Sequence, residues 1–445
     1  MIISIPEKVN TVLQTLQERG YEAYVVGGCV RDSVLGITPK DWDITTNASP
    51  LEVKACFART VDTGLQHGTV TVLLDGDSYE VTTYRIDGVY EDGRHPSSVS
   101  FTRSLSEDLR RRDFTINAMA YSPQAGLVDL FDGLGDIRRG LIRAVGEPAA
   151  RFSEDALRML RAVRFSARLN YEIEEETRCA IRLLAPTLNL ISAERIREEL
   201  MGILLSPHPE KLADAAKFGM TAVFLPELDR CFETPQNHPH HCLNVGEHIL
   251  RSVQAARPDR ILRLTMLFHD IGKPLCHTRD EAGLDHFRGH AEAGMELTRQ
   301  IMTRLKFDRD SIEKVSRLVR WHDLRPEMTP RAMRRAMVKV GPDLFPLLLE
   351  VKAADLAAQS SYKAQEKQAQ LHQWEELYRE VRESRCALSL KDLAVSGRDL
   401  IAEGITPGVQ IGNILGVMLE DVLDHPEHNT KEYLLSAYVR KQNNT

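Results

Sequence analysis

The residues of this chain best suited to phosphate chemistry are two aspartates separated by one residue, Asp41 and Asp43 in the segment KDWDITT. They follow the apolar run YEAYVVGG, which predicts a buried strand ending in a turn at Gly27 and Gly28, where backbone approaches a ligand closely. On a following strand both carboxylates would lie on one face, because side chains alternate with period two. Two carboxylates beside a glycine turn indicate magnesium-dependent phosphoryl transfer, although a surface Asp-x-Asp pair has the same pattern.

Two further segments contain residues that suit the same chemistry. In SYEVTTYR, Glu80 is a candidate third carboxylate near the metals, and an exposed strand glutamate is the alternative. In RRRDFTINAMAY, Arg111 and Arg112 suit triphosphate oxygens, because guanidinium groups bind phosphate bidentately. Asp113 and Asn117 lie one helical turn apart and would orient a ribose or a loop. A solvated basic cluster with a helix cap would have the same composition.

A third segment, FSEDALRMLRAVRF, predicts a device for base selection. Asp155 and Arg158 are three residues apart, so on a helix they would face the same way. An acceptor beside a donor complements the edges of cytosine and adenine, whereas uracil and guanine present the reverse order. The pair would therefore select C and A without a template. The alternative is an ordinary helix ion pair worth a few tenths of a kcal/mol.

Bulk properties limit the class of protein. The chain has 445 residues, which predicts two to four domains, and a net charge of −7, which gives no global nucleic-acid signature. Seven scattered cysteines predict reduced thiols. No signal pattern and no apolar run approaching ~18 residues is present, so we expect a soluble, cytoplasmic protein that does not enter a membrane.

The hydrophobic pattern predicts an α+β multidomain protein. Strands and helices mix over residues 1–145, and a helical pattern, with charges opposite the apolar residues, covers 146–230. A histidine-rich helical region follows at 231–360, and a helical tail at 361–445 is interrupted by glycine and proline at 404–412. Arginines that would supply a local positive path for RNA form two groups: Arg151, Arg158, Arg161, Arg164 and Arg168, and then Arg317, Arg320, Arg325, Arg331, Arg334 and Arg335.

Six motifs in this order resemble the class II tRNA nucleotidyltransferases, the CCA-adding enzymes, which are related to bacterial poly(A) polymerases. They are GGCVRDSVLG…KDWDITT, DTGLQHGTVTV, RRRDFTINAMAY, DLFDGLGDI, FSEDALRMLRAVRF and ISAERIREEL. The resemblance covers about residues 20–230 and implies a polymerase-β-like head, a mixed sheet with helices, followed by an all-α neck. It implies that Asp41 and Asp43 bind magnesium. Its implied nucleotide contacts are Gly28, Arg31, Arg112, Asp155, Arg158, Arg161 and Arg164, with Glu154 in support.

The implied function is addition of C, C and A to the 3′ end of tRNA from CTP and ATP, with two-metal in-line transfer and release of pyrophosphate. DTGLQHGTVTV matches the tRNA-enzyme form of its segment, which disfavours a poly(A) polymerase. Residues 86–101, IDGVYEDGRHPSSVSF, resemble the flexible loop of enzymes that add the terminal A. An A-adding specialist acting on tRNA that ends in CC remains open, as does the oligomeric state.

A second set of metal-ligating residues lies in the histidine-rich region. Imidazole and carboxylate groups on helices suit a divalent metal. The set comprises His248, His269, Asp270, His290, His322, Asp323 and Asp355. Its order, with HDIGK at the centre, resembles the HD phosphohydrolase superfamily.

The resemblance makes His248, His269, Asp270 and Asp355 the ligands, and His290 and His322 further candidates, while His240 and His241 are expected in a loop. It implies a transition metal (Ni, Mn, Co or Fe) and phosphatase or 2′,3′-cyclic phosphodiesterase activity. Two alternatives are a retained fold without hydrolysis, and a phosphohydrolase whose head only binds RNA.

Overall fold

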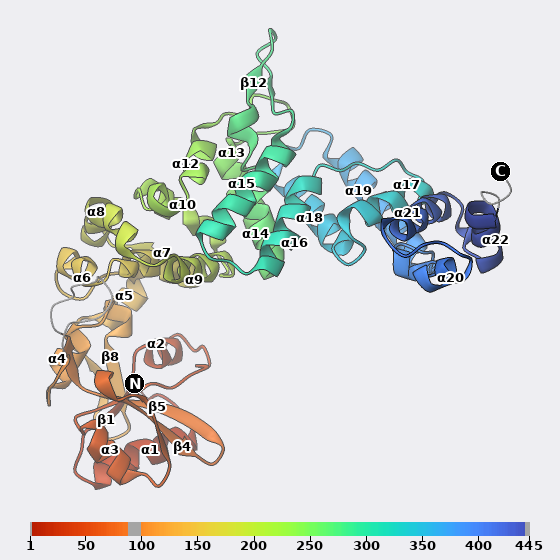
Figure 1. The fold of residues 1–445 in the computed structure, drawn as a ribbon. Coiled ribbons are helices and arrows are strands. Elements are labelled where there is room, and N and C mark those ends of the chain that lie inside the picture. The colour runs from red at the N-terminus through yellow and green to blue at the C-terminus, as the bar shows by residue number, and fades with distance from the viewer. Residues whose placement is uncertain (1, 88–98, 441–445) are drawn as a thin grey trace. The chain divides into compact units, whose positions relative to one another are not determined.

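The computed structural model describes residues 2–87 and 99–440, which form two compact units, Met1–Asp229 and Arg230–Thr445 (Figure 1). The division falls one residue from the predicted boundary at 230/231. The finer division into four domains stays a prediction. No helix of the described residues is long and apolar enough to span a bilayer.

The first unit is built on a seven-stranded mixed sheet in the order β3-β4-β5-β2-β1-β8-β9. Its strands are β1 Ala23–Val26, β2 Ile44–Thr46, β3 Thr60–Gly64, β4 Thr69–Leu74, β5 Asp77–Thr83, β8 Met119–Ser122 and β9 Gly126–Asp129. Within this sheet, β2 and β5 pair in parallel and the other printed pairs of neighbours are antiparallel. The predicted strands at 23–26 and 69–74 are confirmed. β4, TVTVLL, buries Val70 and Val72 because branched side chains pack well on a pleated surface.

Helices and short strand pairs complete the sheet domain. Helix α1 (Glu7–Glu18) contacts β1 and α3 (Pro50–Cys56), and α3 contacts β4 and β5 (Figure 1). A capping box between Ser49 and Glu52 fixes the start of α3. The remaining elements are α2 Gly28–Val34, β6 Arg85–Asp87, β7 Val99–Phe101, α4 Leu105–Arg110, α5 Gly133–Arg139, β10 Leu141–Ile142 and β11 Glu172–Ile173.

The second half of this unit is helical, as predicted. Its helices are α6 Pro148–Glu154, α7 Leu157–Leu169, α8 Glu175–Leu184, α9 Ala193–Leu204, α10 Leu212–Lys217, α11 Thr221–Phe224 and the first part of α12 Pro226–Glu233. Helix α7 packs on α9, and α6 packs on α8. The apolar positions of α7 are buried, among them Met159, Leu160 and Val163, while its arginines lie on the opposite stripe.

The second unit is almost entirely helical. Its helices are α13 Val245–Ala255, α14 Arg260–Phe268, α15 His290–Arg304, α16 Arg309–Trp321, α17 Pro330–Val340, α18 Phe345–Ala358, α19 Ala364–Glu383, α20 Gly397–Ala402, α21 Val409–Asp424 and α22 Lys431–Leu435. A small hairpin joins β12 (Thr278–Arg279) to β13 (Asp285–His286). Helices α13, α14, α16 and α18 pack against one another, which brings distant histidines and aspartates together. One hydrophobic core continues from Leu318 to Val439, on both sides of residue 360.

Candidate functional site

The Asp41–Asp43 pair lies directly before β2, not on it, and beside the glycine turn that ends β1. The main-chain N–H of Val26 donates to the carbonyl of Asp43 at 3.0 Å, so the backbone pairing of β1 with β2 continues through this residue. The pKa of Asp43 is raised because neighbouring protein displaces part of its water; the Arg112 guanidinium opposes this shift and the Asp41 carboxylate adds to it. Two neighbouring carboxylates that both keep contact with solvent suit hard divalent cations.

The glycine turn presses directly against Arg112. Gly27 has φ of +81°, and a Cβ at this position would lie 3.0 Å from Nη1 of Arg112. Arg112 also contacts buried Asp108 at 3.4 Å, and its Nε has no hydrogen-bond partner among the described residues. Arg112 therefore places a positive charge beside the two aspartates. Gly28, another predicted nucleotide contact, is the first residue of α2.

Arg31 is held inside the protein. The residue is 2% exposed, and its guanidinium donates to Asn117 and Asp32 and lies 5.2 Å over the ring of Phe165. The pKa of Arg31 is lowered by burial, against the stabilising charge of Asp32. Arg31 thus fixes α2 against the segment that carries Asn117, while its predicted contact with the triphosphate stays a prediction.

The Asp113–Asn117 segment differs from the predicted helical turn. Only Thr115–Asn117 is helical, as a single 3-10 turn, and Asp113 precedes it. Asn117 donates to Asp113 at 3.2 Å, and Arg161 binds the other oxygen of Asp113 at 2.7 Å. Burial would raise the pKa of Asp113, but the Arg161 guanidinium outweighs it and holds this pKa at about 2. Of the two roles considered, holding a loop is the one these bonds perform.

The prediction that Asp155 and Arg158 share one helical face is wrong. Asp155 has extended backbone, φ −142° and ψ 103°, in the break between α6 and α7. Its carboxylate binds Arg195 of α9 at 2.8 and 3.3 Å. Arg158, on α7, instead binds Glu154 at 2.6 Å and donates to the carbonyl of Arg111. The two side chains are therefore fixed separately and do not pair with each other.

The arginine stripe of the first unit is tied to carboxylates. Arg164 binds Glu199 at 2.6 Å and lies 4.5 Å over Phe165, and Arg168 binds Asp32 at 2.8 Å. Arg151 and Arg161 pair with Glu154 and Asp113. The stripe therefore exists, but each member already has an acidic partner.

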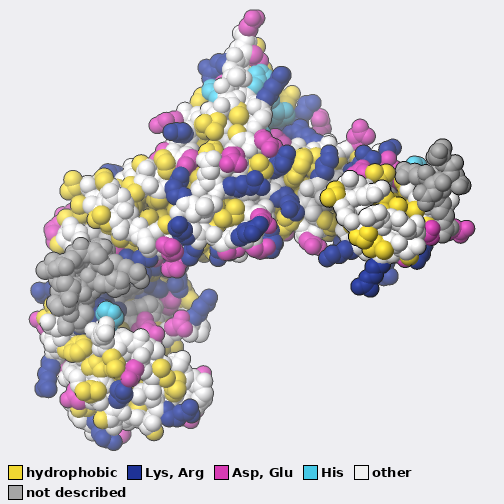
Figure 2. All heavy atoms as spheres, in the orientation of Figure 1, with side chains coloured by type: hydrophobic (Ala, Val, Ile, Leu, Met, Phe, Trp, Pro, Cys, Tyr) yellow, Lys and Arg dark blue, Asp and Glu magenta, His cyan; other side chains and the backbone are white. Residues whose placement is uncertain are grey.

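The arginines of the second group differ in exposure and in their partners. Figure 2 shows Lys and Arg side chains spread over α15 and α16, interspersed with Asp and Glu. Arg331 and Arg335 both bind Asp424, and Arg320 binds Glu292 at 3.2 Å. Arg334 is buried and donates to the carbonyl of Leu423 at 2.7 Å, so its predicted role in a surface path for RNA is wrong.

Two further predictions concern Glu80 and the segment at 86–101. Glu80 is exposed on β5, directly before Val81, which pairs with Ile44 of β2 in parallel register. This position is compatible with a third carboxylate, which stays a prediction. Most of the loop expected at 86–101, residues 88–98, lies outside the described part of the chain.

Sequence reasoning missed the acidic and basic residues that hold the predicted nucleotide-binding side chains in place. Arg195 and Glu199 lie in ISAERIREEL and hold Asp155 and Arg164. Asp108 is fully buried and binds Arg111 at 2.8 Å. The positive charges of Arg111 and Arg112 lower the pKa of Asp108 although burial would raise it. A signal was available, because Glu199 and Asp108 fall on apolar stripes of their helices where an unpaired acid would be costly.

The histidines and aspartates of the second unit converge as predicted. Nε2 of His248 lies 3.0 Å from Asp355, 3.4 Å from Asp270 and 3.2 Å from Nε2 of His269. His248 is on α13, His269 and Asp270 follow α14, and Asp355 is on α18. His290 and His322 approach Asp270 from α15 and the end of α16. Lys273 also binds Asp270, at 2.7 Å. The imidazole nitrogens and carboxylate oxygens of this cluster are a donor set that fits a divalent metal.

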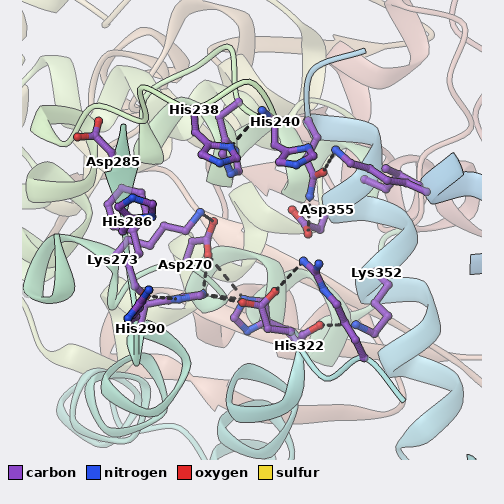
Figure 3. Close-up of a pocket in the computed structure, with 18 of the residues that line it drawn as sticks. His238, His240, Asp270, Lys273, Asp285, His286, His290, His322, Lys352 and Asp355 are labelled. Carbon is purple, nitrogen blue, oxygen red and sulfur yellow. Dashed lines mark hydrogen bonds and ion pairs between the residues drawn. The ribbon is translucent and has the colours of Figure 1, made fainter. Parts of the chain in front are cut away.

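A pocket of about 490 Å³ opens over this cluster (Figure 3). Asp270, His290, His322 and Asp355 lie on its wall, and the labelled Lys273 and Lys352 approach from two sides. Further cationic or aromatic lining residues are Arg288, Arg325, Lys367, His238, His240, His241 and Trp374. Metal-ligating groups and a cationic lining in one pocket suit a phosphate ester. His240 and His241, expected to be loop residues, are in the loop before α13 but line this pocket.

The fold and the first site together define a nucleotidyltransferase: a mixed sheet presents an Asp-x-Asp pair and an arginine beside a glycine turn, next to a helical neck. Family models agree with this class. Residues 23–143 match "Poly A polymerase head domain", residues 170–232 match "Probable RNA and SrmB- binding site of polymerase A", and residues 290–438 match the model of tRNA nucleotidyltransferase domain 2.

Relatives cover the chain from end to end. It is 36% identical over 432 residues to the CCA-adding enzyme of Levilactobacillus brevis, with 97% of each chain covered. It is 35% identical over 433 residues to that of Lactiplantibacillus plantarum, covering 96% of this chain and 95% of the relative. The chain therefore belongs to the CCA-adding enzyme family.

Solved structures support the same assignment. The crystal structure of the Bacillus stearothermophilus CCA-adding enzyme in complex with CTP matches with a TM-score of 0.74 and 31% identity, covering 99% of both chains. A Thermotoga maritima CCA-adding enzyme complexed with tRNA-CCA matches at TM-score 0.57 and 21% identity, covering 98% of this chain and 96% of that one, a likeness of fold alone.

Proposed function

We propose that this protein adds CCA to the 3′ end of tRNA, using CTP and ATP in the cytoplasm. The observation that carries this proposal is the Asp41–Asp43 pair, which faces Arg112 across the glycine turn at Gly27 in a chain similar throughout to CCA-adding enzymes. In each step the tRNA 3′ oxygen forms a bond to the α-phosphorus, the bond to pyrophosphate breaks, and the hydroxyl proton passes to solvent.

The two aspartates would hold Mg²⁺, which supplies charge stabilisation for both the attacking and the leaving oxygen. Their solvent contact and mutual repulsion, relieved by a cation, fit this role. Arg112 would bind the triphosphate through its Nη groups, because Nη1 lies against Gly27 and the guanidinium charge acts on the Asp43 carboxylate.

Base selection would use Asp155 and Arg158, which are held in place by different neighbouring residues. Arg195 holds the Asp155 carboxylate, while Glu154 and the carbonyls of Arg111 and Arg151 hold Arg158. An acceptor and a donor that are each fixed by several bonds discriminate between base edges better than flexible groups, because mismatched groups cannot move away to find other partners.

The test uses purified protein, Mg²⁺ and each labelled triphosphate, with tRNA ending at the discriminator base or in CC. Addition of C, C and A that stops there is the expected result. Addition of a single A to the CC-ended tRNA alone would identify an A-adding specialist instead. The Asp41→Asn/Asp43→Asn variant is the control and should transfer nothing, although it should still bind tRNA.

A second function is favoured by the cluster in the second unit. We propose that His248, His269, Asp270 and Asp355 hold a divalent transition metal for hydrolysis of a phosphate ester in the pocket of Figure 3. Water would form a bond to phosphorus, the ester P–O bond would break, and the proton would pass to the leaving oxygen. Hydrolysis of 2′,3′-cyclic AMP or p-nitrophenyl phosphate with added Ni²⁺, Mn²⁺ or Co²⁺ tests this. The activity should vanish in His269→Ala while nucleotidyl transfer persists.

A further inference from the structure

The connection between α21 and α22 carries two histidines and a glutamate that neither proposed activity uses. His425 caps the C-terminal end of α21, and Pro426–His428 forms a single 3-10 turn that contains Glu427 and His428. One possible ligand atom from each of these three side chains lies within 4.8 Å of the other two. Imidazole nitrogens and a carboxylate oxygen are ligands that zinc and neighbouring divalent transition metals prefer.

The ring of His428 is oriented so that one nitrogen is available to a cation. Its Nδ1 lies 3.0 and 3.1 Å from the two carboxylate oxygens of Asp421. An ionised carboxylate only accepts hydrogen bonds, so Nδ1 carries a proton and the neutral ring has its lone pair on Nε2. The ring of Tyr433 stacks on that of His428, with centroids 4.0 Å apart. A carboxylate behind a ligating imidazole is common at metal sites, because it fixes the tautomer and makes the other nitrogen more basic.

The other two side chains have nearly the spacing of ligands that share one ion. Nδ1 of His425 lies 3.5 Å from Oε1 of Glu427. Two ligand atoms about 2.1 Å from a tetrahedral cation are separated by roughly 3.4 Å. The rings of His425 and His428 lie side by side, with centroids 4.8 Å apart. An ion pair between His425 and Glu427 would explain the first contact, but it does not explain why a second imidazole with a fixed lone pair lies beside it.

A cation can enter this group from solvent without a change of fold. The side chains of His425 and Glu427 are 57% and 70% exposed, whereas those of His428 and Asp421 are 26% and 15% exposed. Packing and hydrogen bonds therefore hold one ligand in place, and the two exposed ligands are free to turn toward an ion.

We propose that His425, Glu427 and His428 bind one divalent transition-metal cation, and that Asp421 positions His428. Zn²⁺ matches this ligand set best, and three protein ligands leave its fourth tetrahedral position to water. The bound ion fixes the connection between the end of α21 and Thr430, the N-cap of α22. The site shares no residue with the cluster around Asp270 and depends on neither proposed activity.

The experiment compares zinc binding by the full-length parent and its variants. Each protein is stripped with a chelator, incubated with micromolar Zn²⁺, passed through gel filtration and analysed by mass spectrometry for metal. His425→Ala/His428→Ala should hold one Zn²⁺ per chain fewer than the parent. Amide hydrogen exchange over residues 421–430 reports this site alone, and we expect it to slow when Zn²⁺ binds.

The role of Asp421 is tested by the same exchange measurement. Asp421→Asn keeps all three ligands, and the Zn²⁺ concentration that slows exchange should rise roughly 10- to 100-fold. Asp421→Glu keeps the charge and should bind Zn²⁺ more tightly than Asp421→Asn. An unchanged zinc requirement in Asp421→Asn would overturn the positioning role.

His372→Ala is the matched control. His372 of α19 also lies beside carboxylates, 3.2 Å from Glu376 and 3.7 Å from Glu375, but no second histidine of the described residues completes a metal-binding group there. This variant should hold as much Zn²⁺ as the parent, and a loss of Zn²⁺ would overturn the proposal.

Two other results would overturn the proposal. One is equal zinc content in the parent and in folded His425→Ala/His428→Ala. The other is slowing of exchange only at millimolar Zn²⁺, which indicates an adventitious ion only. If circular dichroism shows that the double variant is unfolded, exchange in the parent decides alone: slowing at micromolar Zn²⁺ supports the site, and unchanged exchange refutes it.

Discussion

Removing Arg195 should weaken discrimination among nucleotides without removing a residue expected to touch them. Arg195 binds Asp155 through two contacts of 2.8 and 3.3 Å, with both side chains largely shielded from water. A hydrogen bond between charged groups is worth about 1.5–3 kcal/mol. At 1.36 kcal/mol per factor of ten, losing this orientation lowers the kcat/KM ratio of CTP to UTP by up to about 10- to 150-fold in Arg195→Ala.

The assay measures kcat/KM for CTP, ATP, UTP and GTP on tRNA ending at the discriminator base and in CC. Arg195→Lys keeps the charge but loses the planar fork, so its ratio should be intermediate. Arg197→Ala is the matched control, because it removes an arginine two residues further along α9, where side chains point to another face. The reasoning is refuted if Asp155→Ala lowers the ratio while Arg195→Ala leaves it unchanged.

Four other outcomes are expected. Asp43→Asn should lower nucleotidyl transfer by roughly 10²–10³-fold, with tRNA binding in a filter assay unchanged. Gly27→Ala should raise KM for CTP and ATP, since its φ of +81° costs another residue about 1–3 kcal/mol and its Cβ displaces Arg112; a normal KM would contradict this. The pKa of Asp113 is about 2 when folded, below its ordinary 3.8, so its contribution to stability is present above pH 4 and disappears towards pH 2. In urea unfolding, this group should lower the free energy of unfolding of the parent by up to about 2 kcal/mol between pH 4 and pH 2. That contribution should be absent in Asp113→Asn. A chelator should abolish phosphate-ester hydrolysis, and Mn²⁺ or Ni²⁺ should restore it.

The sequence alone predicts two strands of the head, β1 and β4. β4 and β1 are short apolar, β-branched runs bounded by glycine, and such patterns determine both the element and its buried face. The pattern predicts Asp41 and Asp43 on a strand, whereas they lie three residues and one residue before the first residue of β2. The first and last residues of a strand depend on its hydrogen bonds to the partner strand, and the hydrophobic periodicity of the sequence gives no information on these bonds.

Pairing between distant charges was not predictable. The three-residue spacing of Asp155 and Arg158 suggests a shared helical face, but α6 ends at Glu154 and α7 begins at Leu157. Arg195, forty residues further along the chain, takes Asp155 instead. Likewise the metal-ligating histidines were identifiable by type and order, whereas their arrangement as two pairs around Asp270 depends on how four helices pack.

The ion pairs of the arginine stripe have a consequence for how tRNA binding would respond to salt. Arg164 and Arg168 are already neutralised by Glu199 and Asp32, so a phosphate that approaches them exchanges one anion for another. Such an exchange releases fewer counterions from the nucleic acid than a contact with a free cation. The slope of log affinity against log salt should therefore be shallower than the number of arginines along the stripe suggests.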